Sequence, residues 1–187
     1  MKIKTLPGTN IEANLAKENA AKKIIDPMFL TGGLVLSQIS GVTGLEPHII
    51  QNWVRRGFLS SPMNKKYSKN QFCRVLTINF LRDSLQIDKI TRLMCYINGK
   101  LSDNSSDIIN DSDLYYYFVN IISKIDFNIE NVDRTIDEKL LSYRELHQGD
   151  KEKLKNVLKA MTMFYISSQM KSIAEVMLIN NFEEGSI

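Results

Sequence analysis

The chain of 187 residues has few of the residues that build disulfides, metal sites and catalytic centres. It holds two cysteines, Cys73 and Cys95, and two histidines, His48 and His147. Neither cysteine has a histidine or the other cysteine near it in the sequence, so neither a disulfide framework nor a zinc knuckle is indicated. Neither histidine stands beside a Ser or Cys nucleophile in a known motif. The composition therefore favours a reducing compartment.

Motifs for catalysis, cofactors and membranes are missing as well. The sequence has no P-loop, GxGxxG, HExxH or GxSxG pattern, and residues 103–113 lack the central Gly and terminal Glu of a calcium loop. The N-terminus has no apolar signal core, and no run approaches the roughly 20 apolar residues of a membrane span. We therefore predict a cytoplasmic protein that is not an enzyme, with no cofactor, no metal and no membrane segment.

Acidic residues are absent between Pro47 and Arg82. That segment carries seven bases, which are Arg55, Arg56, Lys65, Lys66, Lys69, Arg74 and Arg82. Residues 101–150 hold eleven acids against four bases, so the overall charge of +3 conceals two halves of opposite sign. A concentrated positive charge is the electrostatic footprint of a surface that meets phosphate. The two halves are predicted to do different jobs, within one compact domain or two small ones.

The basic segment has the pattern of two short helices joined by a tight turn. The apolar stripe of the first helix and its turn is Leu36, Ile39, Val42 and Leu45, and Thr43-Gly44 marks the helix end. Pro47 suits the first turn of the second helix, where its missing N–H has no partner to lose. Ile50, Trp53 and Val54 share its inner face. Trp53 is predicted in the core, the alternative being a platform on which bases stack.

Weaker patterns divide the rest of the chain. Residues 58–67 suit a small β wing with a cationic tip, and Ser68 with Gln71 forms a capping box that starts a third helix. A fourth helix should end at Asn98-Gly99. We predict helices also over 10–25, stopped by Asp26-Pro27, and over about 111–124, 133–147 and 150–182. The predicted division is an N-terminal arm or helix (1–30), a basic domain (31–99), a linker (100–110) and an acidic all-α domain (111–187).

The basic segment resembles the N-terminal DNA-binding domain of the MerR family of bacterial regulators. The matching residues are Thr43-Gly44, Pro47, Arg55-Arg56-Gly57-Phe58-Leu59, Tyr67-Ser68 and the helix from Ile87 to Met94. Over about residues 30–180, the runs TGLEPHIIQNWVRRG, KKYS and ING before SxLYxYF resemble an uncharacterised family of low-GC Gram-positive proteins with a MerR-like N-terminal part. The resemblance implies a mostly α fold, with a winged helix-turn-helix followed by an all-α C-terminal region.

The resemblance also implies which side chains meet double-stranded DNA. Second-helix residues with groups that pair with base edges are His48, Gln51, Asn52 and Arg55. Residues suited to phosphate or to the wing are Arg56, Lys65, Lys66, Tyr67 and Lys69. Gln51 and Asn52 stand where many MerR proteins have Arg and Tyr, so the base contacts of that family do not carry over. The alternative is that these side chains form only a solvated polar face.

Two features of the acidic half leave alternatives open. The run Tyr115-Tyr116-Tyr117-Phe118, beside Asp111 and Asp113, either lines a pocket for a cation or has acids that only favour a helix N-terminus. Helical geometry allows at most two of the four rings to share a pocket. The stripe Leu154, Val157, Leu158, Met161, Phe164, Ile173, Val176 and Met177 is either a core or a dimer seam. MerR-like proteins dimerise through C-terminal helices, so the resemblance favours a homodimer.

The sequence thus predicts a sequence-specific DNA-binding transcriptional regulator of the MerR-like type, with its effector unidentified. Two alternatives stand beside it. The same fold could bend DNA as an architectural or excisionase-like protein, or its basic face could dock an acidic protein, which would make the chain an interaction adaptor.

Overall fold

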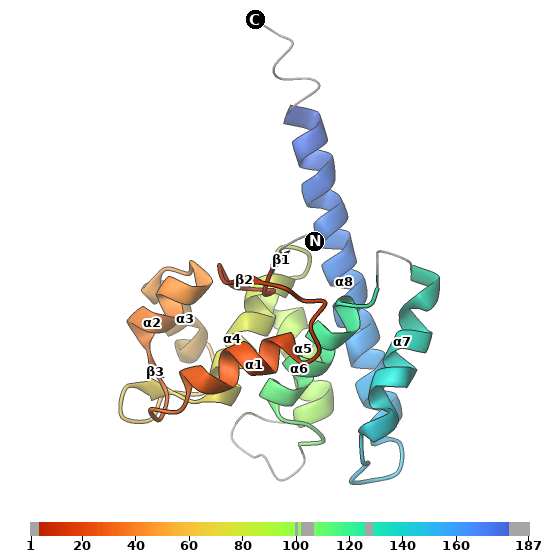
Figure 1. Ribbon diagram of the computed structural model, residues 1–187. Helices are drawn as coiled ribbons and strands as arrows, with labels where there is room; N and C mark the ends of the chain where they lie inside the picture. The colour runs from red at the N-terminus through yellow and green to blue at the C-terminus, as the bar shows by residue number, and fades with distance from the viewer. Residues whose placement is uncertain (1–3, 100, 102–106, 126–128, 180–187) are drawn as a thin grey trace, which may run out of the picture.

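The computed structural model describes residues 4–99, 101, 107–125 and 129–179. It is mostly α-helical, which confirms the predicted class (Figure 1). The described helices are α1 (Ala20–Met28), α2 (Leu36–Thr43), α3 (Pro47–Arg55), α4 (Lys69–Leu81), α5 (Ile87–Asn98), α6 (Asp111–Ile122), α7 (Val132–Lys139) and α8 (Asp150–Leu178), with 3₁₀ turns η2 (Ile129–Asn131) and η3 (Leu140–Ser142). Four short strands are β1 (Lys4–Thr5), β2 (Glu12–Ala13), β3 (Leu34–Val35) and β4 (Lys66–Tyr67).

The N-terminal segment differs from the helix predicted over 10–25. Its first part is a hairpin in which β1 pairs antiparallel with β2, and the helix begins only at Ala20. Leu6, Ala13 and Leu15 are all buried in this segment, so tertiary burial outweighs the local helix propensity of the alanines and lysines. A Cβ on Gly8 would lie 2.4 Å from the Leu76 carbonyl oxygen, and its φ of +76° also favours glycine. The hairpin is thus pressed directly onto α4.

Helices α2 and α3 form as their sequence pattern predicts. Gly44 ends α2 in the left-handed conformation, with its N–H donating to the Ser40 carbonyl. Pro47 occupies the first turn of α3, where no N–H is needed. Ile50 and Trp53 are 0% and 3% exposed, so the prediction that Trp53 belongs to the core is confirmed.

The predicted wing is smaller than expected and draws on a strand that sequence reasoning missed. Within residues 58–67, backbone bonds join Met63 to Lys66 in both directions, across a turn in which Asn64 and Lys65 have positive φ. Positive φ at both central residues is the geometry of a type I′ hairpin turn. The partner of β4 is β3, which lies before α2 and pairs Leu34 with Tyr67.

Helix α4 lies at the centre of the fold. Its N-terminus has the predicted capping box, because the Gln71 N–H donates to Ser68 Oγ and the Ser68 N–H donates to Gln71 Oε1. The helix packs against α2, α5, α6 and α8. Phe80 of α4 stacks on Phe118 of α6 with 4.4 Å between ring centroids, and Tyr165 of α8 meets Phe118 edge-on at 5.6 Å. These rings join the basic and acidic halves.

The buried apolar side chains form one cluster that runs from Leu6 to Ile166. The cluster contains residues on both sides of the boundaries predicted at 30–31 and 110–111. The division into four parts stays a prediction. Of the predicted linker, the structure describes residues 101 and 107–110, and Ile108 and Ile109 are both buried. Residues 100 and 102–106 of that linker lie outside the described part.

The C-terminal helices differ in length from their predictions. Helix α7 ends at Lys139 and passes into η3, so the helix predicted over 133–147 is too long. Helix α8 ends at Leu178, and residues 180–182 of its predicted span lie outside the described residues. The helix is buried at intervals as far as Ile166, and its last turns project away from the body (Figure 1). No helix in the described part is long and apolar enough to cross a membrane.

The stacked rings predict that the two halves unfold together. Replacing Phe118, which is fully buried, by Ala should lower the free energy of unfolding by about 3–5 kcal/mol. Denaturant curves followed by the fluorescence of Trp53, in the basic half, and by far-UV circular dichroism should shift together. Leu141→Ala, at a leucine that is 79% exposed, is the control and should change little. Separate transitions in the two signals would contradict a shared core.

Candidate nucleic-acid interface

The outer face of α3 carries the side chains predicted to reach base edges. His48, Gln51 and Arg55 are exposed, and Asn52 is half-buried beside them. Arg55 Nη2 donates to Asn52 Oδ1 at 2.8 Å, so these two side chains form one continuous polar surface. Because the opposite face of α3 is held in the core by Ile50 and Trp53, the polar face has a fixed direction.

The wing places its two lysines in solvent and its tyrosine in the core. Lys65 and Lys66 are exposed, and Lys66 Nζ donates to the Thr31 carbonyl at 3.4 Å. Tyr67 is only 3% exposed, and burial raises the pKa of its phenol. Successive strand residues point to opposite sides, so an outward Lys66 requires an inward Tyr67. The prediction that Tyr67 contacts DNA is therefore corrected, and Tyr67 is a core residue.

Acids from outside the basic segment neutralise part of its charge. Arg56 lies over the Phe58 ring at 4.4 Å and is 3.6 Å from Asp88 of α5. Lys69 Nζ lies 2.8 Å from Asp26 Oδ1, at the end of α1. Both predicted phosphate contacts therefore have acid partners from distant parts of the chain. Counting charges along the sequence could not reveal these ion pairs.

Asp26 is the centre of a small polar cluster beside the wing. It also pairs with Lys22 at 2.9 Å and accepts a hydrogen bond from the Tyr116 hydroxyl at 2.8 Å. Hydrogen bonds from Lys69 and Lys22 hold the pKa of the Asp26 carboxyl well below its ordinary value. The cluster thereby joins α1, α4 and α6.

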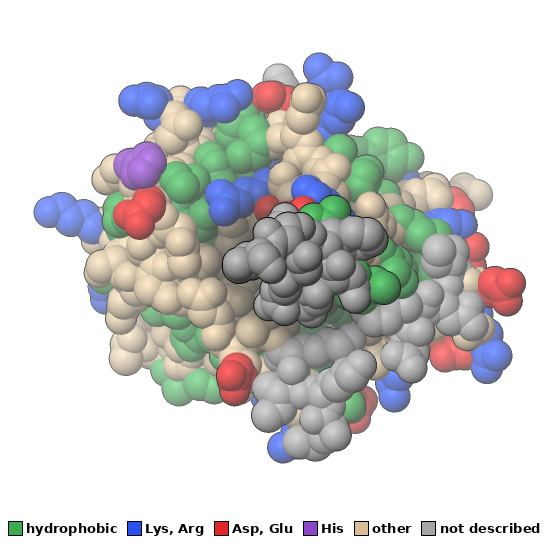
Figure 2. Space-filling model, turned by 90° about the horizontal axis from the view of Figure 1, so that it is seen from above, with side chains coloured by type: hydrophobic (Ala, Val, Ile, Leu, Met, Phe, Trp, Pro, Cys, Tyr) green, Lys and Arg blue, Asp and Glu red, His purple; other side chains and the backbone are tan. Residues whose placement is uncertain are grey.

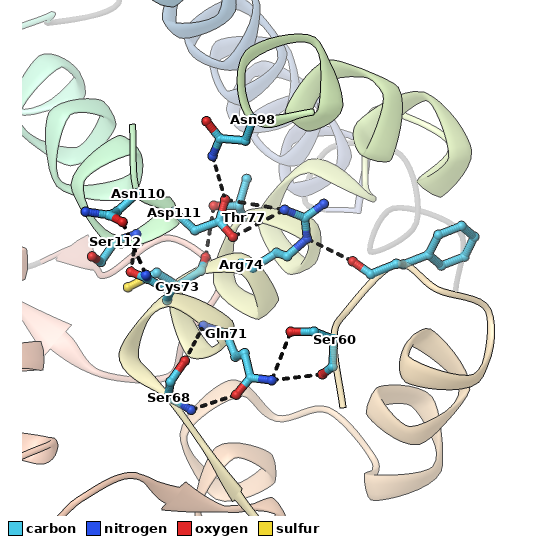
Figure 3. A network of polar contacts seen from close by, with 12 residues as sticks. Ser60, Ser68, Gln71, Cys73, Arg74, Thr77, Asn98, Asn110, Asp111 and Ser112 are labelled. Atoms are coloured by element: carbon cyan, nitrogen blue, oxygen red, sulfur yellow. Dashed lines mark hydrogen bonds and ion pairs between the residues drawn. The ribbon is translucent and has the colours of Figure 1, made fainter. Parts of the chain in front are cut away.

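Arg74 is the largest departure from the predicted cationic face. Its side chain is 4% exposed, and its Nε donates to the Phe58 carbonyl at 2.9 Å (Figure 3). Its Nη1 lies 3.2 Å from Asp111 Oδ2, and the Asn98 amide lies 3.5 Å from Asp111 Oδ1. Burial raises the pKa of the Asp111 carboxyl, and the charge of Arg74 opposes that rise. In the sequence Arg74 stands within an apolar run that includes Val75 and Ile78, both of which are buried. That run was the one signal in the sequence that Arg74 is buried.

The unpaired cations of the basic segment are those of α3 and the wing, together with Arg82. Within the residues that the structure describes, no acid forms an ion pair with Arg55, Lys65, Lys66 or Arg82. Seen from above, Lys and Arg side chains project from the outline on the side of α2 and α3, where few acids are visible, whereas on the side of α7 Lys and Arg are interspersed with Asp and Glu (Figure 2). The charge asymmetry of the sequence is thus partly kept in space.

An apolar hollow separates α3 from the wing. Its volume is about 490 Å³, and its lining is Val35, Leu36, Ser37, Gln51, Val54, Pro62, Lys65 and Tyr67. Gln51 and Lys65 line it from α3 and from the wing. One predicted base-reading side chain and one predicted phosphate-binding side chain therefore border the same hollow.

The tyrosine run of α6 divides between the core and a second cavity. Tyr116 and Tyr117 line a cavity of about 940 Å³, whereas Tyr115 and Phe118 are fully buried, which confirms that at most two rings share a pocket. The charged side chains of the cavity are of both signs, with Glu18, Asp107, Asp113 and Glu138 opposed by Lys22, Lys139 and Arg144. The lining therefore does not select a cation.

Comparison with protein families matches residues 33–118 to the family described as a domain of unknown function, DUF1836. This part of the chain is similar to that family over the span from β3 into α6, which includes α3, the wing and the Arg74–Asp111 pair. The comparisons with curated proteins and with solved structures found no match.

The Asp26 cluster predicts a pH-dependent contribution to stability. A carboxyl whose pKa is lowered by folding stabilises the fold above its ordinary value of 3.8, and this contribution is lost as pH falls toward the lower folded-state value. Asp26→Asn should therefore lower the free energy of unfolding at pH 7 by up to about 1 kcal/mol, a small value because the site is partly solvated, and the melting temperature should fall with it. The difference from the wild type should shrink below pH 3.8. Asp83→Asn, at an exposed acid, is the control, and a pH-independent difference for Asp26→Asn would count against the ion pairs.

Proposed function

We propose that this protein is a cytoplasmic DNA-binding transcriptional regulator of the MerR-like winged helix-turn-helix type. The observation that carries the proposal is the exposed polar face of α3, placed beside a wing whose two lysines have no acid partner among the described residues. An α-helix of this kind fits the major groove of B-DNA, and its amide and guanidinium groups can pair with base edges. Exposed lysines next to it can contact phosphate.

The order of elements supports this proposal. The resemblance to MerR-like domains implies a helix-turn-helix, a wing and two further helices, and the chain has α2 and α3 joined by a three-residue turn, then β4, α4 and α5. Helix α3 is anchored on its inner side by Ile50 and Trp53, which leaves its outer face rigid and accessible. Base reading would fall to His48, Gln51, Asn52 and Arg55, and phosphate contact to Lys65 and Lys66. Arg56 and Lys69 would contact phosphate only after leaving their ion pairs with Asp88 and Asp26.

Homodimer formation through α8 is the second part of the proposal. On the projecting end of α8, Met170, Ile173 and Met177 follow the 3-4 spacing of a coiled-coil seam, which continues the stripe of Met163 and Ile166 at the core. Met170, Ile173 and Met177 are 46%, 49% and 59% exposed on the projecting end of the helix. The flanking seam positions Ser167, Gln169, Ala174 and Val176 carry no charge that would repel a second copy. A twofold dimer would present two copies of α3 to an inverted repeat.

The DNA-binding proposal predicts distinct effects for α3 and the wing. Changing Gln51, Asn52 and Arg55 to Ala should abolish the enrichment of a specific sequence from a random duplex library. Lys65→Ala plus Lys66→Ala should weaken binding to every sequence, and should reduce the slope of log K against log salt concentration by about 0.9 per lost phosphate contact. Lys124→Ala plus Arg144→Ala, which removes two exposed cations of the acidic half, is the matched control.

Several results would overturn this assignment. An unchanged affinity in the wing variant would remove the wing from the interface. Failure of the folded wild type to bind any duplex would remove the regulator, and retention of a protein partner after nuclease treatment would favour an adaptor. Strong bending without sequence enrichment would favour an architectural protein.

The dimer proposal predicts a change of mass. Sedimentation equilibrium of the wild type should give twice the chain mass of 21.4 kDa. Ile173→Glu places a charge in the seam and should shift the mass to that of one chain, because two desolvated carboxylates would face each other. Ser172→Glu adds the same charge on the outer face of the helix and should leave the dimer intact. A monomeric wild type would refute the seam.

A further inference from the structure

The end of α3 is held by a side chain from another helix. Gly57 reverses the chain with a φ of +74°, and the N–H groups of Phe58 and Leu59 both donate to the Trp53 carbonyl. The Phe58 carbonyl in turn accepts the hydrogen bond from Arg74 Nε at 2.9 Å. Arg74 thus binds the turn that terminates the proposed reading helix.

The other side of Arg74 is fixed by the acidic half. Its Nη1 binds Asp111 at the start of α6, and Asp111 also accepts a hydrogen bond from Asn98 at the end of α5 (Figure 3). A planar guanidinium donates in fixed directions, so a bond from Nε and a bond from Nη1 together define the distance between their two acceptors. One side chain therefore bridges the α3 turn and the start of α6.

Stability alone does not explain this arrangement. A buried ion pair is weak evidence for stability, because desolvation of the two charges offsets their attraction and apolar residues of similar volume often serve as well. Asn98 is also buried, and its Oδ1 has no hydrogen-bond partner among the described residues, which is unfavourable. What these polar groups supply, and apolar packing does not, is direction.

We propose that Arg74 and Asp111 are positioning residues that orient α3 for DNA reading by holding its C-terminal turn at a fixed place relative to α6. This inference rests on the proposed DNA-binding function. Arg74 does not contact DNA in this arrangement, because its side chain is buried beneath the turn. A change at the start of α6 would reach the α3 turn through Arg74, in addition to the packing of α6 on α4.

The test compares two aspartates at helix N-termini, Asp111, whose side chain is 13% exposed, and Asp150, which is buried. Asp111→Asn and Arg74→Lys should each weaken DNA binding about 5- to 150-fold, the value of one lost base contact. Each should also shift the fluorescence of Trp53, the single tryptophan of the chain, at a temperature where circular dichroism shows folded protein. Asp150→Asn is the matched control, because Asp150 is 2% exposed and its polar partners include the His147 N–H and Lys153, which lie at or just before the start of α8 and not on α3. It should lower the melting temperature and leave affinity and Trp53 unchanged.

A second variant covers the case in which a single change prevents folding. Arg74→Met with Asp111→Leu removes both charges together, which buried pairs often tolerate, yet it loses the bond to the Phe58 carbonyl. Reduced affinity and faster hydrogen exchange at the Phe58 and Leu59 amides would support positioning. If this variant folds and its DNA affinity, its Trp53 emission and the hydrogen exchange of these amides equal those of the wild type, the positioning role is wrong. If the wild type bound no duplex, the proposed function would fail, and Trp53 emission and amide exchange would still decide the positioning role.

Discussion

Burial of α4 on nearly all sides is the constraint on which the rest of the structure depends. Nine of its residues are buried, including the continuous run from Phe72 to Ile78. A helix that is buried on most faces needs neighbours on each of them, and α2, α5, α6 and α8 provide them. The N-terminal hairpin lies against a further part of it, where Gly8 meets the Leu76 carbonyl. The acidic half is therefore part of the surroundings that the basic half needs.

The same packing redistributes charge. Once α1, α5 and α6 surround α4, Asp26, Asp88 and Asp111 come within reach of Lys69, Arg56 and Arg74. These ion pairs have different strengths, because the Arg56 pair is largely solvated and screened, whereas the Arg74 pair is buried. Of the seven bases of the basic segment, those without an acid partner among the described residues are Arg55, Lys65 and Lys66, on α3 and the wing, and Arg82. Electrostatic attraction for phosphate would be focused there and would be strongly dependent on salt.

Helix α8 links the proposed interface with the proposed dimer. Its first turns enter the shared core, where Tyr165 packs on the Phe80–Phe118 stack, and its last turns extend an exposed apolar stripe. A second copy bound to that stripe would be connected rigidly to α4 and α6, since these helices pack on α8. The spacing of two reading helices would then be set by one continuous helix in each chain.

Local chemistry was enough to predict several elements from the sequence. Gly44, Pro47 and the Ser68–Gln71 box act through bonds within a few residues, so the ends of α2, α3 and α4 follow from the sequence alone, as does the burial of Trp53 on an apolar helix face. Tertiary contacts decided the rest. The N-terminal hairpin lies against α4, where Gly8 meets the Leu76 carbonyl, and β3 pairs with β4 across the whole of α2 and α3, Leu34 with Tyr67 and Val35 with Lys66.

The same division holds for the candidate site. The residue types of α3 and of the wing predicted a polar, cationic surface, because exposure there follows from helical and strand periodicity. The sequence could not show that Tyr67 is in the core, that Asp26 holds Lys69, or that Arg74 is buried against Asp111, which is 37 residues distant. Each of these depends on which helices pack on α4. The sequence by itself determined the local elements and the sign of the charge, and only the tertiary structure decided which charges remain available, because ion pairing depends on distance in space and not along the chain.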